Sequence, residues 1–224
     1  MDRDLLDRQG FVLVRGLFPA NSVALAALDD LPAVRGGIRF PEVDHPVLNE
    51  WIDDPGLAEV IRGVVGGSAR RVRSILFDKT PDANWPVLWH QDKTITVEDQ
   101  REVDGFGPWS QKVGQPHVQP PASVLEGMLT ARIHLDDCDS GNGALQVLPG
   151  SHREGVLSPE EVRSRVDSGT PFSCEAQAGD VLFMRPLVLH ASGKSTRDTH
   201  RRILHLEYAR PDLPGGLRFG CVRR

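Results

Sequence analysis

The chain has 224 residues, of which 39% are hydrophobic and 25% are charged, and its formal net charge is −5. This composition can form a sizeable core and argues against wholesale disorder. The mildly acidic balance, without long basic blocks, argues against nucleic acid or an anionic membrane as the main partner. The three cysteines lie far apart without a CxxC motif, which disfavours a disulfide framework or a thiolate zinc site. Because no apolar run reaches the roughly 20 residues of a membrane helix and no apolar signal core is evident, we expect a soluble, cytoplasmic protein.

Helical patterns are concentrated in the first third of the chain. Residues 2–9 suit a short amphipathic helix, and residues 10–18 (GFVLVRGLF) suit a strand. Pro19-Ala20-Asn21-Ser22 can start a helix that carries VALAALDDL. Residues 53–65 have an acidic start and apolar spacings of three and four, which predict a helix that ends at the following glycine pair.

Short runs of β-type composition, separated by turn signals, fill most of the remaining sequence. They predict strands at 71–79, 87–91, 128–135, 144–149, 172–176, 180–184, 187–191 and 202–209. Strands of this kind after an α-rich start are typical of a β-sandwich or barrel with helices packed outside. We therefore expect a mainly β fold with flanking helices, formed by one domain over residues 1–224.

One connection is unusually long for a compact domain. Residues 95–127 lie between two predicted strands and include DGFGPWSQKVGQPHVQPP, which is rich in Gly, Pro and Gln. Such insertions are usually functional loops or disordered segments. Trp109, His117 and Gln119 provide groups that can bind a small molecule. We therefore interpret 95–127 as an active-site lid, with these three residues as candidate substrate contacts.

The stretch WHQD contains a histidine and a carboxylate two residues apart. Residues i and i+2 of a strand face the same side, so His90 and Asp92 can both point inward. A third ligand is needed to hold a metal, and His190, at the end of a later apolar run, is the best candidate. Two histidines and one carboxylate form the facial triad of non-haem Fe(II) oxygenases and leave coordination positions open.

Arg201 follows His190 by eleven residues and opens the next predicted strand. An adjacent antiparallel strand would return this guanidinium to the neighbourhood of the metal, where it can bind a carboxylate through two hydrogen bonds. Ser192 can add a hydroxyl to the same carboxylate. Arg201 and Ser192 together could therefore bind the distal carboxylate of a 2-oxo diacid whose other end chelates the metal. Arg202, the next residue on the strand, should point to the opposite face and therefore serves as a control for the role of Arg201.

Four segments make the chain resemble the phytanoyl-CoA dioxygenase family of Fe(II)/2-oxoglutarate oxygenases. They are WHQD, NGALQVLPGSH, AGDVLF and LHASGKSTRDTHRR, in this order. The resemblance implies a double-stranded β-helix (a cupin-like jelly roll) with iron at His90, Asp92 and His190. It also implies Fe(II), 2-oxoglutarate and O₂ as cofactor and cosubstrates, with Arg201 and Ser192 at the distal carboxylate of 2-oxoglutarate.

Two further cations have possible roles near the cosubstrate. Lys79, on the strand before WHQD, is a candidate second partner of 2-oxoglutarate. Arg132 stands where relatives often carry an aromatic residue, so it is a candidate contact for the cosubstrate or for an anionic substrate. His134 shares a strand face with Arg132 and is therefore a candidate to line the substrate pocket. A structural, hydrogen-bonded role for His134 is an equal alternative.

The leading hypothesis is a dioxygenase that hydroxylates an unactivated C–H bond of a small polar metabolite, amino-acid-like or a natural-product intermediate, with release of succinate and CO₂. The presence of Asp92 disfavours a halogenase, since that variant lacks the carboxylate. Two alternatives remain open: a zinc-dependent hydrolase with the same ligands, and a non-catalytic metal- or ligand-binding cupin. Neither the substrate nor the oligomeric state follows from the sequence.

Overall fold

The computed structural model describes residues 1–20, 25–29, 31–32, 34–112 and 114–220. Within these ranges, three antiparallel sheets form the fold. The major sheet has the order β1 (Phe11–Val14), β11 (Val181–Met184), β8 (Leu129–His134), β13 (Arg201–Ala209), β3 (Arg70–Lys79) and β2 (Ile38–Arg39). The minor sheet has the order β10 (Phe172–Cys174), β9 (Leu145–Val147), β12 (His190–Ser192) and β4 (Val87–His90). The third sheet has the order β5 (Ile95–Thr96), β7 (Gln115–Val118) and β6 (Trp109–Lys112).

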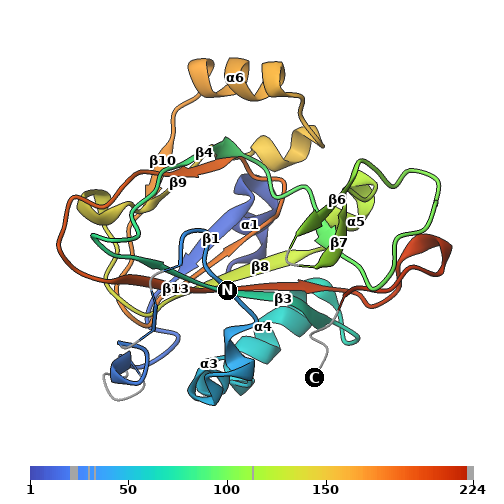
Figure 1. Cartoon of the computed structure of the whole chain (residues 1–224). Helices are drawn as coiled ribbons and strands as arrows, with labels where there is room; N and C mark the ends of the chain where they lie inside the picture. Colours follow the sequence, from blue (N-terminus) through green and yellow to red (C-terminus); the bar gives the residue numbers. More distant parts are fainter. Residues whose placement is uncertain (21–24, 30, 33, 113, 221–224) are drawn as a thin grey trace.

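The major and minor sheets lie one above the other, with helices outside both layers (Figure 1). Helices α3 (Asn49–Ile52) and α4 (Pro55–Val65) cover the outer face of the major sheet, and α6 (Pro159–Ser168) lies above the minor sheet. The remaining helices are α1 (Arg3–Gln9) and α5 (Ala122–Glu126), and short 3₁₀ turns occur at 41–43, 46–48, 140–142, 151–154 and 214–216. The two facing sheets confirm the mainly β, jelly-roll fold.

The long strand β13 shows how the sequence positions the cavity between the sheets. Leu204, Leu206 and Tyr208 belong to the apolar core that also contains buried residues of α4. The odd-numbered residues Arg201, His205 and Glu207 line a cavity on the other face. Because side chains alternate along a strand, one face of the same strand stabilises the fold by burying apolar surface. The other face is free to carry polar groups into the interior.

The predicted elements agree with the structure over most of the chain. The expected helix at 53–65 is α4, which begins where the Asp54 side chain accepts a hydrogen bond from the Leu57 amide and ends at Gly66. The eight expected strands occur within a few residues of their predicted positions. The helix expected to carry VALAALDDL falls partly on residues 21–24 and 30, which lie outside the described residues.

Residues 95–127 contain regular structure that the sequence did not predict. They form the three-stranded sheet β5-β7-β6 and helix α5, beside one end of the major sheet (Figure 1). Ile95, Val118 and Leu125 pack into a second core cluster, to which Trp109 adds a partly buried ring. The segment is therefore folded against the jelly roll by its own apolar contacts. Its role as a lid stays a prediction.

Gly179, in the turn before β11, provides a test of the fold. Its φ is 91°, and a Cβ atom there would lie 2.1 Å from the carbonyl oxygen of Phe18, which cannot move freely because Phe18 N donates to Gly179 O at 3.0 Å. Gly179→Ala is expected to lower the free energy of unfolding by more than about 2 kcal/mol, measured by chemical denaturation.

Gly63, in the last turn of α4, is the matched control, since a Cβ atom at this position would meet no atom within 4 Å. Gly63→Ala is expected to raise stability by about 0.5–1 kcal/mol because alanine loses less backbone entropy in a helix. Equal effects of the two substitutions would contradict the placement of the Gly179 turn against Phe18.

Candidate active site

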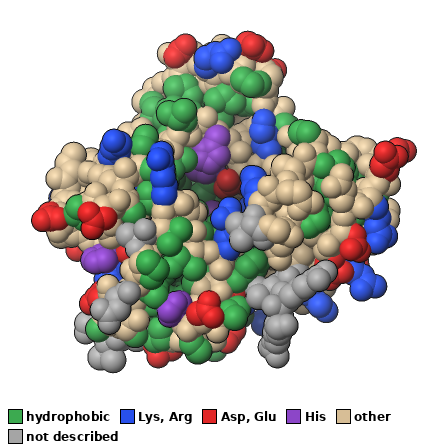
Figure 2. All heavy atoms as spheres, viewed as in Figure 1, with side chains coloured by type: hydrophobic (Ala, Val, Ile, Leu, Met, Phe, Trp, Pro, Cys, Tyr) green, Lys and Arg blue, Asp and Glu red, His purple; other side chains and the backbone are tan. Residues whose placement is uncertain are grey.

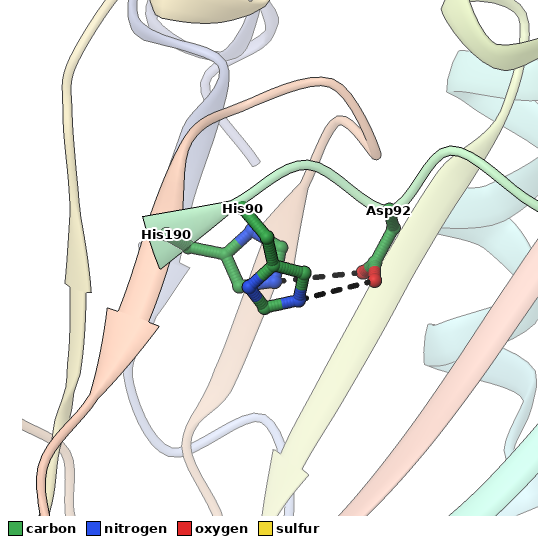
Figure 3. Close-up of side chains that lie close together, drawn as sticks. All are labelled: His90, Asp92 and His190. Carbon is green, nitrogen blue, oxygen red and sulfur yellow. Dashed lines mark ion pairs between the residues drawn. The ribbon is translucent and has the colours of Figure 1, made fainter. Parts of the chain in front are cut away.

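Three predicted ligand residues meet at one end of the minor sheet. His90 and His190 lie opposite each other on the paired strands β4 and β12, and their ring centroids are 4.2 Å apart. Asp92 follows β4 in a loop, held by a hydrogen bond from its amide to Pro186 O at 2.9 Å. Figure 3 shows both imidazole rings pointing toward the Asp92 carboxylate. Residues far apart in the sequence thus present three donor groups to one space.

The hydrogen bonds of both imidazoles favour metal binding. His90 Nδ1 lies 2.8 Å from Leu88 O, and His190 Nδ1 lies 2.9 Å from Val188 O. A carbonyl oxygen only accepts, so each Nδ1 carries the hydrogen and each Nε2 keeps a free lone pair. Each Nε2 is 3.6 Å from an oxygen of Asp92, too long for a hydrogen bond. The donor atoms lie within 4.8 Å of one another, so the three residues fit one divalent cation.

Electrostatics keep His190 and Asp92 in forms that can bind a metal. Burial lowers the pKa of His190 to about 4, against the opposing charge of Asp92. Burial alone would raise the pKa of Asp92, but the neighbouring His190 and His90 lower it well below its usual range. At neutral pH His190 is therefore a neutral imidazole and Asp92 is a carboxylate, which is the ligand chemistry of a 2-His-1-carboxylate site.

Three buried cations line the same cavity on adjacent strands of the major sheet. Arg201 and Lys79 are directly paired across β13 and β3, with 3% and 1% of their surfaces exposed. Arg132 on β8 is 7% exposed. Like charges directly opposite one another destabilise a sheet, and buried charges without partners are costly. Arg201 has no hydrogen-bond or ion-pair partner among the described residues, and its buried Nε atom is unpaired. The arrangement is therefore suited to an anionic ligand.

Lys79 is held in place by neutral groups. Its ammonium donates to Ser192 Oγ at 2.7 Å and to the carbonyl of Gly193, while the Ser192 hydroxyl donates to Gly143 O at 2.8 Å. Burial, and then the charges of Arg201 and Arg132, lower the pKa of Lys79 to about 7. Without a bound anion, half of the Lys79 side chains are therefore neutral near pH 7.

A hydrogen-bonded chain crosses the cavity floor, and the sequence analysis missed most of it. Arg132 donates to His205 Nδ1 at 3.0 Å, which leaves His205 Nε2–H to donate to Glu207 at 3.2 Å. Arg73 donates to the same Glu207 oxygen at 2.9 Å. Strand alternation could have found these residues, because His205 and Glu207 share a face with Arg201, and Arg73 shares one with Lys79.

The cavity opens to solvent beside the metal ligands. It encloses about 560 Å³, part of which is open solvent. Figure 2 shows the hollow in this face, with a histidine at its rim, an acidic side chain inside, and lysine or arginine side chains beside it. Its wall also contains the apolar residues Ile75, Phe77, Trp85, Val87 and Leu145. An apolar wall with a few convergent polar groups is typical of a small-molecule site.

The other candidate substrate residues are not part of this cavity wall. His117 is buried, with Nε2 3.1 Å from Thr96 Oγ1, and Trp109 packs against the second core cluster. The backbone carbonyl of Gln119 accepts a hydrogen bond from Gly107 N at 2.9 Å, and its amide donates to Pro108 O at 3.3 Å. His134 is buried beside Asp180 O at 3.3 Å, and burial together with the charge of Arg132 lowers its pKa to about 3. We propose structural roles for these four residues in place of substrate contact.

A jelly roll with two histidines, one aspartate and a buried cation cluster inside its cavity has the architecture of a cupin-type metalloprotein. The phytanoyl-CoA dioxygenase family model matches residues 6–203. The chain belongs to this family. Among the described residues, no helix is long and apolar enough to cross a membrane.

Individual relatives are distant. A probable phytanoyl-CoA dioxygenase from Caenorhabditis elegans is 25% identical over 76% of this chain and 53% of its own length. The chain thus spans about half the length of that relative. An ectoine dioxygenase from Bordetella parapertussis is 22% identical over 90% of this chain and 72% of its own. The solved structure of the epimerase SnoN in complex with Fe³⁺, alpha ketoglutarate and nogalamycin RO matches with a TM-score of 0.65 and 19% identity, covering 95% of this chain and 89% of SnoN. This last likeness shows the shared fold.

Proposed function

We propose that the protein is an Fe(II)- and 2-oxoglutarate-dependent dioxygenase that hydroxylates a C–H bond of a small polar metabolite. The observation that carries this proposal is the buried Arg201 guanidinium, which has no partner among the described residues. It lies opposite Lys79, in the cavity that also contains the three proposed metal ligands. A metal site alone has no use for two buried cations facing each other. A dicarboxylic cosubstrate that reaches from the metal to these cations explains both features.

Each group has a defined task in this proposal. His90, Asp92 and His190 hold the iron, and Arg201 with Lys79 and Ser192 holds the distal carboxylate of 2-oxoglutarate. With O₂, the bound iron and 2-oxoglutarate supply the oxidising chemistry that places one oxygen atom on the substrate carbon and the other in succinate, with loss of CO₂. The apolar wall around Phe77 and Leu145 excludes water from this chemistry.

The proposed substrate is a small polar molecule, amino-acid-like or a natural-product intermediate. The wall mixes charged and apolar side chains, which suits a polar metabolite better than a long acyl chain. Two of the similar proteins support this substrate class. One is an ectoine dioxygenase, and another was solved with nogalamycin RO.

Succinate release tests the reaction class. The purified protein with Fe(II), 2-oxoglutarate and air is expected to form succinate, and a true substrate should increase the rate and gain one oxygen atom by mass spectrometry. His190→Ala should abolish both signals. A zinc hydrolase or a non-catalytic cupin would form no succinate under any of these conditions, and that result would overturn the proposal.

The lowered pKa of Lys79 predicts how 2-oxoglutarate affinity depends on pH. The free site has a Lys79 pKa of about 7, and a bound carboxylate raises it by favouring the charged ammonium. Binding above pH 7 must therefore take up a proton, so the Kd should rise by up to about tenfold per pH unit above pH 7 until the pKa of the complex is reached. Anaerobic calorimetry on the Fe(II) enzyme measures this slope.

Lys79→Met is the control for the pH dependence. This variant should bind 2-oxoglutarate more weakly, with a Kd that no longer changes between about pH 7 and pH 9. A native Kd that is independent of pH, or an unchanged slope in Lys79→Met, would show that Lys79 does not bind the cosubstrate.

A further inference from the structure

The cavity has a second cationic region, distant from the cations proposed to hold the distal carboxylate of 2-oxoglutarate. Arg73 lines the cavity from the same strand as Lys79, six residues away, which corresponds to about 20 Å along β3. A five-carbon diacid held by Lys79 spans well under half of this distance. Arg73 is therefore too far from Lys79 to share the distal carboxylate of 2-oxoglutarate with it, and it lies instead beside Glu207, near Asp92.

Two further cations lie near Arg73, outside the residues that line the cavity. Arg39 lies on the neighbouring strand β2, and Lys112 lies on β6, in the segment 95–127. Burial first, and then the charges of Arg73 and Arg39, lower the pKa of Lys112. Burial, followed by the charge of Arg73, lowers the pKa of Arg39, whereas Glu207 raises it. The register supports the placement of Arg39, because Arg39 pairs with Ile75, which shares a face of β3 with Arg73. Repulsion from Arg73 therefore acts on both Arg39 and Lys112.

Glu207 is the carboxylate paired with this group. It lies opposite Arg73 across β13 and β3 and forms the ion pair with Arg73 at 2.9 Å. Arg73 NH2 donates to Thr94 O at 2.7 Å, but the Nε atoms of Arg73 and Arg39 are buried without a hydrogen-bond partner among the described residues. Three cations against one carboxylate leave an excess of two positive charges.

The charge of the whole cavity leads to the same conclusion. Its wall has three arginines, Arg73, Arg132 and Arg201, together with Lys79 and two carboxylates, Asp92 and Glu207, an excess of two positive charges when Lys79 is protonated, as it would be beside a bound carboxylate. A ferrous ion adds two positive charges and 2-oxoglutarate adds two negative ones, so the excess persists in the loaded site. An interior of low dielectric makes such an excess costly unless an anion balances it.

We propose that Arg73, with Arg39 and Lys112, binds a carboxylate or phosphate group of the substrate and so aligns the substrate across the metal site. The proposal rests on the dioxygenase function and narrows it to anionic substrates. Because Lys112 comes from the 95–127 segment and Arg73 from the jelly roll, a bound anion bridges the two parts of the protein. The substrate anion would compete with Glu207 for Arg73, because these two residues form an ion pair.

The test uses probes that share a three-carbon backbone. They are glycerol, glycerate, glycerol 3-phosphate and 3-amino-1,2-propanediol, which are neutral, a carboxylate, a phosphate and a cation. Each is titrated anaerobically into the Fe(II)/2-oxoglutarate enzyme, with calorimetry and the visible band of the ferrous 2-oxoglutarate complex as readouts. We expect at least one anion to bind about tenfold or more tightly than glycerol, with weaker binding at high salt. The two anions separate carboxylate from phosphate recognition.

Variants assign the effect to named residues. Arg73→Gln should weaken binding of the preferred anion about tenfold or more, and the exposed Lys112→Gln should weaken it by roughly threefold. Glu207→Gln removes the competing carboxylate and should strengthen anion binding. Arg62→Gln removes the same charge from an exposed position on α4, outside the cavity wall, and should change nothing.

Two outcomes would overturn the proposal. One is that no anion binds better than glycerol at concentrations up to tens of millimolar. The other is that the aminopropanediol binds best and Glu207→Gln weakens it, which would make Glu207 the recognition group for a cationic substrate. In both cases an intact ferrous 2-oxoglutarate band together with succinate formation by the native and Arg73→Gln proteins would show that the dioxygenase function stands and that only the substrate class is wrong.

Discussion

Asp92→Asn is expected to weaken Fe(II) binding by more than about a hundredfold and to abolish succinate formation. The substitution keeps the size of the side chain and its position after β4, but it replaces the only anionic ligand of the proposed triad with a neutral amide. The two imidazoles would then face a cation without the charge that partly offsets it. Equilibrium dialysis against Fe(II) under argon measures the change in affinity.

Asp99→Asn is the matched control for this experiment. Asp99 is exposed and pairs only with Arg101 at 3.3 Å among the described residues, so this substitution removes the same charge without touching the cavity. Its Fe(II) affinity and activity should equal those of the native protein. Native-like iron binding by Asp92→Asn would contradict the assignment of the carboxylate as a ligand.

Arg201→Gln is expected to raise the Kd for 2-oxoglutarate by roughly 10²- to 10³-fold, equivalent to about 3–4 kcal/mol. The bound distal carboxylate would lie in a buried site beside Lys79 without its guanidinium partner. Fe(II) binding should remain, because Arg201 is not a metal ligand. Calorimetry with Fe(II)-loaded enzyme therefore separates the two binding steps.

Arg202, the neighbouring residue on β13, is the matched control for Arg201→Gln. It points to the helical side of the major sheet, where it donates to Asp136 at 2.9 Å and to Asp29 at 2.6 Å. Arg202→Gln should lower the free energy of unfolding by about 1–3 kcal/mol and leave 2-oxoglutarate affinity unchanged. If both variants lost the cosubstrate equally, the effect would reflect damage to β13, and Arg201 would lose its assigned role.

The sequence predicted the elements whose local signals agree with the final structure. Runs of β-type composition bounded by turn signals identified β3 and β13, and the apolar run before His190 identified the strand region that carries it. Asp92 points into the cavity as expected, but not because it lies on a strand, and its role as a metal ligand stays a prediction. β4 ends at His90, and the hydrogen bond to Pro186 O places Asp92 in the following loop.

The features that were missed depend on contacts between distant parts of the chain. The pairing of Arg73 with Glu207 spans 134 residues and follows from the register of β3 against β13, which local patterns do not determine. The strands in 95–127 are short and contain Pro116, so their β-propensity is weak. Helix α6 was not predicted, although its sequence indicates where it begins, because Ser158 and Glu161 form a capping box.

Anaerobic titration of the purified apo-protein with Fe(II) and then 2-oxoglutarate is the measurement to make first. A 2-oxo acid chelated to ferrous iron gives a weak visible charge-transfer band, and we expect that band in the native protein and its loss or weakening in His90→Ala and Arg201→Ala. If no band forms while zinc binds tightly, the triad holds a metal but the proposed chemistry is wrong. If no metal binds at all, the protein has the family fold without a dioxygenase site.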